Sequence, residues 1–313
     1  MPKLNPKEVK LLMDKALLTA SQVVLGKEET LKLAFACILA KGHLLIEDLP
    51  GLGKTTMAHT LAQVFGLAFQ RIQFTSDMLP ADILGASIFN RQENSFEFHP
   101  GPIFSQVVLA DEVNRATPKC QSALLEAMEE RQVTTEGNTY PLPEPFFVVA
   151  TQNPTHQIGT FPLPEAQMDR FLMRLTMGYP PKEAERALLA GKDRRDMVAS
   201  LPQALAAPQL LAIQAAVGEV HVSEALLDYV QAVIEFTRQT AHFTTGLSPR
   251  GGLALMRSAQ AWALMHGRNH VLPEDVQSVM VATTVHRLQS GSGEQGAQNT
   301  DSLASQLLSV PIP

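Results

Sequence analysis

A glycine-rich turn between an apolar run and a helical pattern carries the clearest chemistry in the chain. It consists of Pro50, Gly51, Leu52, Gly53, Lys54, Thr55 and Thr56, and the apolar residues 44–46 precede it. Glycines let backbone N–H groups point at a bound phosphate, Lys54 brings a positive charge to it, and the Thr55 hydroxyl can ligate Mg²⁺. A helix beginning at residue 56 would add the positive end of its dipole. The order of strand, loop and helix predicts a nucleoside triphosphate site.

One position of this loop departs from the usual pattern. Such loops normally open with glycine, and Asp48 stands there instead. An acid so close to phosphates must either turn away from them or cap the amides of the loop itself. The sequence leaves both possibilities open.

Two further apolar runs end in polar residues. Residues 107–110 end in Asp111 and Glu112, and residues 146–151 lead to Asn153. We expect the first strand to lie beside the phosphate-loop strand, with Asp111 joining Thr55 at the metal and Glu112 polarising the attacking water. Asn153 would hydrogen-bond the γ-phosphate or that water. Each pattern alone is weak, because many strands end in acids and Asn-Pro is an ordinary turn. Together they predict hydrolysis of ATP with Mg²⁺.

The elements that position these residues can be traced from apolar periodicity. Helices are expected over residues 6–20, 28–40, 56–65 and 118–130, and strands over 69–74, 107–112, 146–151 and 172–176. A short extended stretch over residues 23–26 offers Val24 and Gly26 as a wall for the adenine ring, or else is a connector packed in the core. Residues 86–98 and 131–142 alternate around polar tips and predict two hairpins, although the first could be a solvent loop.

After a break at residues 178–181 the pattern becomes helical. The fold expected is therefore α/β, with a parallel sheet between helices and two β-hairpin insertions, followed by a smaller all-helical domain. Residues 1–179 would form the nucleotide-binding domain and residues 180–289 the helical domain. Residues 290–313 begin with a Gly/Ser/Gln-rich stretch and are expected to be a flexible tail, with residues 301–310 either a short helix or disordered.

Composition excludes several classes of protein. A length of 313 residues suits about two domains, and 45% hydrophobic with 18% charged residues is ordinary for a globular protein. A net charge of −6 argues against binding to nucleic acid or an anionic membrane. The two cysteines suit a reducing compartment. With neither a signal-peptide pattern nor a membrane-spanning run, we expect a cytoplasmic protein.

The combination of these motifs resembles the MoxR family of AAA+ ATPases. The resemblance covers roughly residues 20 to 290. The matching stretches are residues 47–55, 73–75, 101–104, 110–116, 124–130, 150–154, 164–171 and 247–250. The same family is similar in lacking the first loop glycine, so Asp48 becomes a mark of the branch. Its AAA+ P-loop NTPase core carries two hairpin insertions, and its helical domain is called the lid.

The resemblance also implies a ring, expected to be a hexamer, with ATP at the interfaces between subunits. Arg170 matches the arginine finger that reaches into the neighbour's site, with Arg174 as the second candidate. Arg250 matches the sensor-2 arginine of the lid, which would couple hydrolysis to lid rotation. Lys54, Glu112 and Asn153 would complete the catalytic set. Family members act as chaperone-like remodelling ATPases in enzyme maturation or metal insertion, often with a partner that bears a von Willebrand factor A domain.

Two other functions remain open at this stage. Helicase-type AAA+ motors also carry hairpins, but the tips here, near Arg91 and Glu136, are neither basic nor aromatic enough to follow a nucleic-acid strand. A nucleotide-dependent scaffold with little turnover is the other alternative. The intact set of Lys54, Asp111 and Glu112 argues against it.

Overall fold

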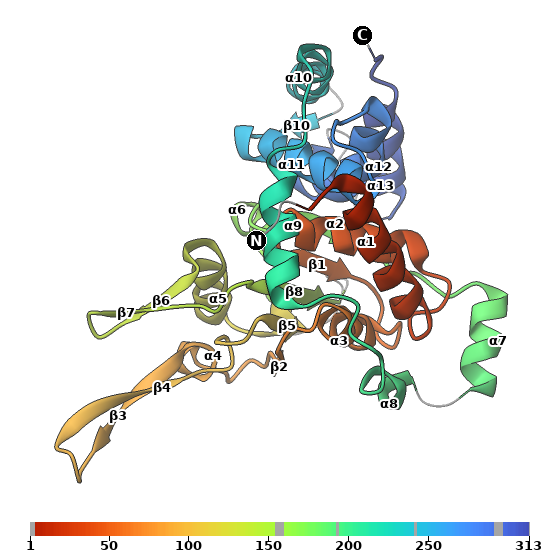
Figure 1. Ribbon diagram of the computed structural model, residues 1–313. Helices are drawn as coiled ribbons and strands as arrows, with labels where there is room; N and C mark the ends of the chain where they lie inside the picture. The colour runs from red at the N-terminus through yellow and green to blue at the C-terminus, as the bar shows by residue number, and fades with distance from the viewer. Residues whose placement is uncertain (1–3, 154–159, 192–193, 241–242, 291–296, 313) are drawn as a thin grey trace.

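The computed structural model describes residues 4–153, 160–191, 194–240, 243–290 and 297–312 (Figure 1). The main sheet of this described part has five parallel strands in the order β2-β5-β8-β1-β9. The strands are β1 (Leu44–Glu47), β2 (Phe69–Gln73), β5 (Val107–Asp111), β8 (Phe147–Gln152) and β9 (Met173–Leu175). Because all five run in one direction, the phosphate loop and the polar ends of β5 and β8 meet at one edge.

The two faces of this sheet are buried by different helices. Side chains alternate along a strand, so Leu44 and Ile46 join the cluster on one face and Leu45 the cluster on the other. The first cluster contains α1 (Pro6–Ser21), α2 (Glu28–Leu39) and α3 (Lys54–Val64), and the second contains α4 (Pro80–Leu84) and α5 (Pro118–Glu130). The prediction of a parallel sheet between helices is confirmed.

Both predicted hairpins are present and project from the body on the side of α4 and α5 (Figure 1). The first consists of β3 (Gly85–Asn90) and β4 (Ser95–Pro100), and the second of β6 (Gln132–Thr135) and β7 (Asn138–Pro141). The rings of Phe98 and Tyr140 stack with centroids 4.1 Å apart, so the two hairpins touch each other. Near the tip of the first hairpin, Ile88, Phe89 and Phe96 are exposed.

The second half of the chain is helical. Its helices are α7 (Lys182–Ala190), α8 (Arg194–Val198), α9 (Ala207–Val217), α10 (Glu224–Gln239), α11 (Pro249–Met265), α12 (Pro273–Thr284) and α13 (Ala297–Leu308). The helical domain also holds a small antiparallel ribbon of β10 (Phe243–Thr245) and β11 (Gln289–Ser290), which no pattern had predicted. Short 3₁₀ turns η1 (Val113–Arg115) and η2 (Val285–Arg287) and the helix α6 (Glu165–Met168) complete the described elements.

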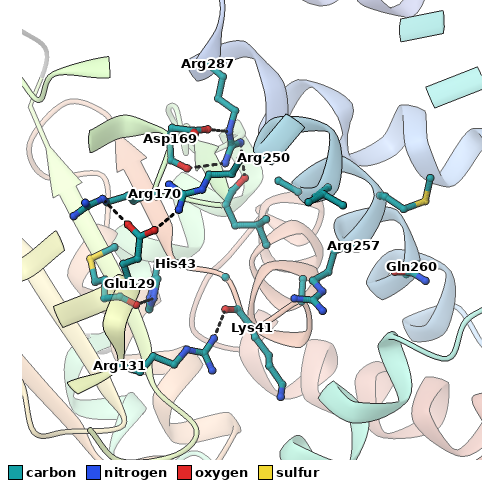
Figure 2. Close-up of a pocket in the computed structure, with 17 residues that line it drawn as sticks. Lys41, His43, Glu129, Arg131, Asp169, Arg170, Arg250, Arg257, Gln260 and Arg287 are labelled. Carbon is teal, nitrogen blue, oxygen red and sulfur yellow. Dashed lines mark hydrogen bonds and ion pairs between the residues drawn. The ribbon is translucent and has the colours of Figure 1, made fainter. Parts of the chain in front are cut away.

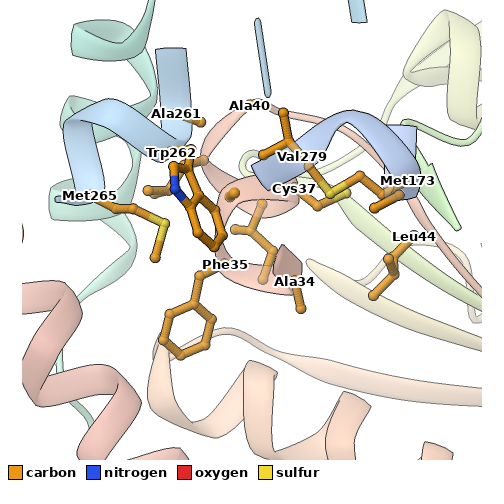
Figure 3. Close-up of a cluster of buried hydrophobic side chains, with 14 of the residues drawn as sticks. Ala34, Phe35, Cys37, Ala40, Leu44, Met173, Ala261, Trp262, Met265 and Val279 are labelled. Atoms are coloured by element: carbon orange, nitrogen blue, oxygen red, sulfur yellow. The ribbon is translucent and has the colours of Figure 1, made fainter. Parts of the chain in front are cut away.

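The helical domain shares one hydrophobic core with the nucleotide-binding domain. Phe35 of α2 lies near Trp262 of α11, and Cys37 of α2 lies beside Met173 of β9 and Val279 of α12, all in the same cluster (Figure 3). Helix α11 contacts both α1 and α2, and α12 contacts β9. This packing joins the two domains over a continuous apolar seam.

Three local expectations were wrong. Residues 23–26 form a turn rather than an extended stretch, with Gly26 in the left-handed region at φ +65°. Helix α3 begins at Lys54, two residues earlier than expected, because left-handed Gly53 (φ +87°) caps it. Strand β5 pairs with β2 and β8, so β1 lies between β8 and β9 and not beside β5.

Part of the expected flexible tail is the helix α13, which agrees with the short-helix alternative for residues 301–310. Helix α13 contacts α10 and α12, and Leu303, Leu307 and Val310 are buried. An apolar residue every three to four positions gives this helix a face to bury. The Gly/Ser-rich residues 291–296 lie outside the described residues.

Candidate active site

The phosphate loop follows β1 and leads directly into α3. Gly51 and Gly53 have φ of +85° and +87°, a conformation in which only glycine is unstrained. Pro50 and Gly51 are exposed, Leu52 and Gly53 are half-buried, and the hydroxyl residues Thr55 and Thr56 are half-buried at the helix start. The first N–H groups of a helix have no partner within the helix, so the start of α3 beside this loop is suited to bind an anion.

Lys54 is buried at the base of this loop. Its side chain is held in a polar setting, because Nζ donates to the backbone oxygen of Asp48 and to Asn153 Oδ1 at 3.2 Å. Burial lowers the pKa of the Lys54 ammonium, and the nearby carboxylates of Asp48, Asp111 and Glu112 oppose that shift. A cation at this position can bind phosphate oxygens as they enter the loop.

The side chain of Asp48 turns away from the loop. Its Oδ2 accepts the backbone N–H groups of Met177 and Gly178, both at 2.6 Å, and its Oδ1 accepts that of Leu49 at 2.8 Å. Met177 and Gly178 lie between β9 and the first helix of the lid half of the chain. The acid therefore ties the phosphate loop to the inter-domain segment.

Asp111 lies at the carboxyl end of β5 and is already hydrogen-bonded. Thr151 Oγ1 donates to Oδ1 at 2.5 Å, and Arg71 on the neighbouring strand β2 donates to Oδ2 at 2.7 and 3.1 Å. The Arg71 side chain is 49% exposed, so it can leave the carboxylate for solvent. The two charges partly neutralise each other in the structure.

Glu112 is the next residue and adopts a strained backbone. Its φ and ψ are 57° and 45°, a left-handed conformation that is uncommon outside glycine and is often found at functional sites. Three side chains hold its carboxylate: Gln73 at 3.0 Å, Asn153 at 3.1 Å and Arg115 at 3.1 Å. The strain and these contacts aim the carboxylate into the space beside Lys54.

Asn153 connects Lys54 of the phosphate loop with Glu112 at the end of β5. Its Oδ1 accepts from Lys54, its Nδ2 donates to Glu112 Oε1, and its backbone oxygen accepts from Asn114. At 2% exposed it has little freedom to move. An amide fixed between a lysine and a carboxylate is suited to orient a water between them.

The donor set fits a Mg²⁺ ion. The Asp111 carboxylate and the Thr55 hydroxyl supply the hard oxygen ligands that Mg²⁺ prefers, and the remaining ligands would be phosphate oxygens and water. Arg71 would have to release Asp111, and its exposure allows that.

The two residues proposed for the adenine wall have packing roles here. Val24 is buried in the core cluster, and a Cβ on Gly26 would lie 2.6 Å from Pro181. Lys27 Nζ donates to the backbone oxygen of Tyr179 at 2.7 Å. This turn therefore packs on the inter-domain segment, as the connector alternative expected. Contact of Val24 and Gly26 with adenine stays a prediction.

Two predicted arginines meet at the opposite edge of the sheet. Arg170 precedes β9 and Arg250 begins α11, and both bind the carboxylate of Glu129 near the end of α5 (Figure 2). The Arg170 Nε to Glu129 Oε2 distance is 2.9 Å. These residues line a cleft of about 540 Å³, which also receives Arg131, Arg257 and other basic residues. We call Glu129, Arg170 and Arg250 the Glu129 cluster.

Arg174, the second finger candidate, has partners within its own subunit. It lies in the middle of β9, and its NH1 donates to Glu47 Oε2 at 3.1 Å. Its NH2 donates to Thr300 of α13 at 3.3 Å. These bonds make Arg174 a link between the sheet and the last helix.

Several residues at these two sites were missed from the sequence. Arg71 and Gln73 are two residues apart on β2, so their side chains lie on the same face of the sheet. This spacing could have placed them near the acids at the end of the adjacent strand β5. Glu129 lies in the matching stretch of residues 124–130, but no role was predicted for it. Arg287, whose side chain is only 4% exposed, contacts the Arg170 segment and lies in the part of the chain that was predicted only to be helical.

Comparison with known proteins agrees with this architecture. The model of the ATPase family associated with various cellular activities (AAA) matches residues 43–173, and that of the AAA lid domain matches residues 235–306. Chaperone MoxR1 from Mycobacterium tuberculosis is 39% identical over 88% of this chain and 75% of its own length. This chain belongs to the MoxR family of AAA+ ATPases.

Other relatives of this MoxR-family ATPase extend over nearly the whole chain. An uncharacterised protein, YeaC from Bacillus subtilis, is 46% identical over 88% of this chain and 87% of its own length. The crystal structure of a candidate ATPase from Cytophaga hutchinsonii matches with a TM-score of 0.86 and 35% identity, covering 98% and 96% of the two chains. The family and fold predicted from the sequence are confirmed. None of the described helices is long and apolar enough to cross a bilayer.

Proposed function

We propose that this ATPase works as a hexameric ring in which each nucleotide is hydrolysed between two subunits. The observation that carries the proposal is the position of the Glu129 cluster. Arg170 precedes β9, whereas the phosphate loop follows β1, and the two strands are parallel. At about 3.3 Å per residue, the four residues of β1 alone separate these edges by roughly 10 Å. The arginines are therefore suited to a neighbour's nucleotide rather than to their own.

Within one site, the residues at the carboxyl edge would share the work of hydrolysis. Lys54 and the loop N–H groups bind the phosphates, and Asn153 and Glu112 orient the water, with Glu112 accepting its proton. Mg²⁺, when bound by Thr55 and Asp111, supplies positive charge next to the transferred phosphate. Arg170 and Arg250 of the adjacent subunit would then exchange Glu129 for the γ-phosphate. Such a finger contributes about 10³–10⁵ in rate.

A mixed-ring experiment tests this arrangement. Rings of Arg170→Ala lack the finger, and rings of Lys54→Ala lack nucleotide binding but keep the finger. Mixing the two should restore hydrolysis at Arg170→Ala sites that face a Lys54→Ala neighbour. If the mixed rings are no more active than the two parent rings measured separately in the same amounts, Arg170 does not act across the interface. Sedimentation with ATP should give a ring, and a monomer in every nucleotide state would also contradict the proposal.

We further propose that the ring remodels a protein client, as the name of the relative MoxR1 suggests for that protein. The support from this chain is the exposed apolar group of Ile88, Phe89 and Phe96 on the first hairpin. Apolar side chains at a projecting tip favour protein contact. With Glu93 and Glu97 beside Arg91, the tip lacks the basic charge that a nucleic-acid strand needs. The client process would be maturation or metal insertion, with a von Willebrand factor A domain partner.

The client proposal can be tested with a trapped ring. Glu112→Gln should hold ATP and retain the client and partner in a pull-down from a cytoplasmic extract. A matched Glu112→Gln ring carrying Phe89→Ser and Phe96→Ser should lose the client and keep the ring. Equal capture by both rings would remove the hairpin from client binding. Salt-dependent binding of DNA would instead favour the nucleic-acid motor.

A further inference from the structure

The segment that carries Arg170 is held by the lid rather than by the core alone. Arg287 Nε donates to Asp169 Oδ1 at 2.6 Å, and its NH2 donates to the backbone oxygens of Asp169 at 3.2 Å and Phe171 at 2.7 Å. Its NH1 donates to Leu172 O at 3.1 Å and to Thr283 O. His286, the preceding residue, contacts Phe171 O at 3.0 Å. One guanidinium thus binds the residues on both sides of Arg170, and Figure 2 shows its contact with Asp169.

We call Arg287, with its hydrogen bonds to residues 169, 171 and 172, the Arg287 clamp. It is buried, whereas Arg170 is partly exposed. The Arg287 side chain is 4% exposed and that of Arg170 is 31% exposed. Burial lowers the pKa of the Arg287 guanidinium, and the hydrogen bond and charge of Asp169 oppose that shift. Ion pairs at such depth often add little net stability, because desolvation offsets the attraction. The planar guanidinium does, however, hold several acceptor oxygens in fixed positions at once, because its N–H donors have a rigid arrangement.

Arg287 also contacts the start of α11, which carries Arg250. A Cβ on Gly251 would lie 3.3 Å from Arg287 Cδ, so the two approach closely. Arg287 therefore touches the segment of Arg170 on one side and the neighbour of Arg250 on the other. Both arginines bind the single carboxylate of Glu129. Arg287 thus contacts a sequence neighbour of each of the two arginines that bind Glu129.

We propose that Arg287 is a positioning residue that fixes the distance between Arg170 and Arg250, so that both reach one γ-phosphate of the neighbouring subunit. This inference rests on the proposed action of Arg170 across the interface. It adds that a residue of the lid, Arg287, holds the finger Arg170 in position. A misplacement of about 1 Å in a reacting group can lower a rate about 10²-fold. Loss of the clamp should therefore slow hydrolysis although every catalytic group is still present.

The test variant is Arg287→Lys, which keeps the positive charge but replaces the fork with a single point donor. We expect kcat to fall about 10- to 100-fold, with the KM for ATP changed less than about threefold, because the phosphate loop lies at the other edge of the sheet. Mixed with Lys54→Ala subunits, whose clamp and finger are intact, Arg287→Lys subunits should regain several-fold activity per subunit. A defect in folding alone would not be rescued by mixing.

Two outcomes would overturn the inference. One is an unchanged kcat in Arg287→Lys, and the other is failure of mixing to rescue it while Arg170→Ala is rescued in the same assay. If Arg170→Ala is not rescued either, the action across the interface fails and this inference fails with it. Should Arg287→Lys not assemble, Gly251→Ala takes its place, since the added methyl group would lie 3.2 Å from Leu247 Cδ2 and 3.3 Å from Arg287 Cδ, and these side chains must shift by a few tenths of an ångström to admit it. A smaller loss of kcat is expected than for Arg287→Lys, with the same rescue by Lys54→Ala subunits, and an unchanged kcat or an absent rescue rejects the role.

Discussion

Replacing Asp48 with alanine should loosen the junction between the phosphate loop and the segment that leads to the lid. The carboxylate accepts two backbone N–H groups of that segment, from Met177 and Gly178, at 2.6 Å each. A hydrogen bond to a charged group contributes about 1.5–3 kcal/mol. Asp48 is only half-buried, so the lower end of that range applies. Loss of both bonds should lower the free energy of unfolding by about 3 kcal/mol.

The same variant should bind ATP more weakly. Lys54 Nζ donates to the backbone oxygen of Asp48, so a displaced Asp48 also disturbs the lysine. We expect a higher KM for ATP, measured by steady-state hydrolysis, together with a lower urea midpoint for unfolding. Asp48→Asn is the matched control, since it keeps an acceptor oxygen without the charge. It should lose about half as much stability, because a neutral acceptor makes a weaker bond.

A second substitution can refute this reasoning. Asp48→Gly restores the residue that such loops usually carry. If Asp48→Gly and Asp48→Ala unfold at the wild-type urea concentration and keep the wild-type KM, the contacts of Asp48 with Met177 and Gly178 have no energetic role. Asp48 would then be a mark of the family branch and nothing more.

Three other predictions concern single side chains. Glu112→Gln should bind ATP but hydrolyse it at least about 10²-fold more slowly, as shown by nucleotide retention against turnover. Arg71→Ala should lower the Mg²⁺ concentration needed for hydrolysis by up to about fivefold, since its exposed pair with Asp111 is worth at most ~1 kcal/mol. Burial lowers the pKa of His43 to about 4, whereas the unfolded chain takes up this proton near pH 6.5. Stability should therefore fall by up to about 3 kcal/mol as pH drops from 6.5 to 4, and His43→Asn should remove that slope in urea titrations.

The parts of the fold that follow local patterns could be predicted from the sequence. Helix α5 has the predicted bounds because proline begins it and its apolar stripe is regular. Strand ends that carry Asp111 and Asn153 were found because apolar runs stop there. The prediction for residues 23–26 was wrong because the shape of this turn depends on left-handed Gly26, which packs against Pro181, a residue distant in sequence.

The contacts around the Glu129 cluster could not be predicted from local sequence patterns. Glu129, Arg170, Arg250 and Arg287 come from four segments, and each alone has the pattern of a helix surface or a loop. A buried arginine such as Arg287 gives no periodic signal, because its burial depends on carbonyls of a segment more than 100 residues away. Family resemblance gave roles to Arg170 and Arg250 but none to their partners Glu129 and Arg287, because only the fold brings these residues together.

The shared core also changes how the lid is expected to act. The family resemblance implied a lid that rotates and carries Arg250 with it, yet Phe35, Met173, Trp262 and Met265 are buried across the seam between the domains. Exposing a large apolar side chain costs about 1.5–3 kcal/mol. Opening the seam at these four residues would then require on the order of 10 kcal/mol, comparable with the whole stability of a typical domain. We therefore expect Arg250 to move with Arg170 and Arg287 as one body, so that loss of the neighbour's γ-phosphate shifts whole subunits against each other.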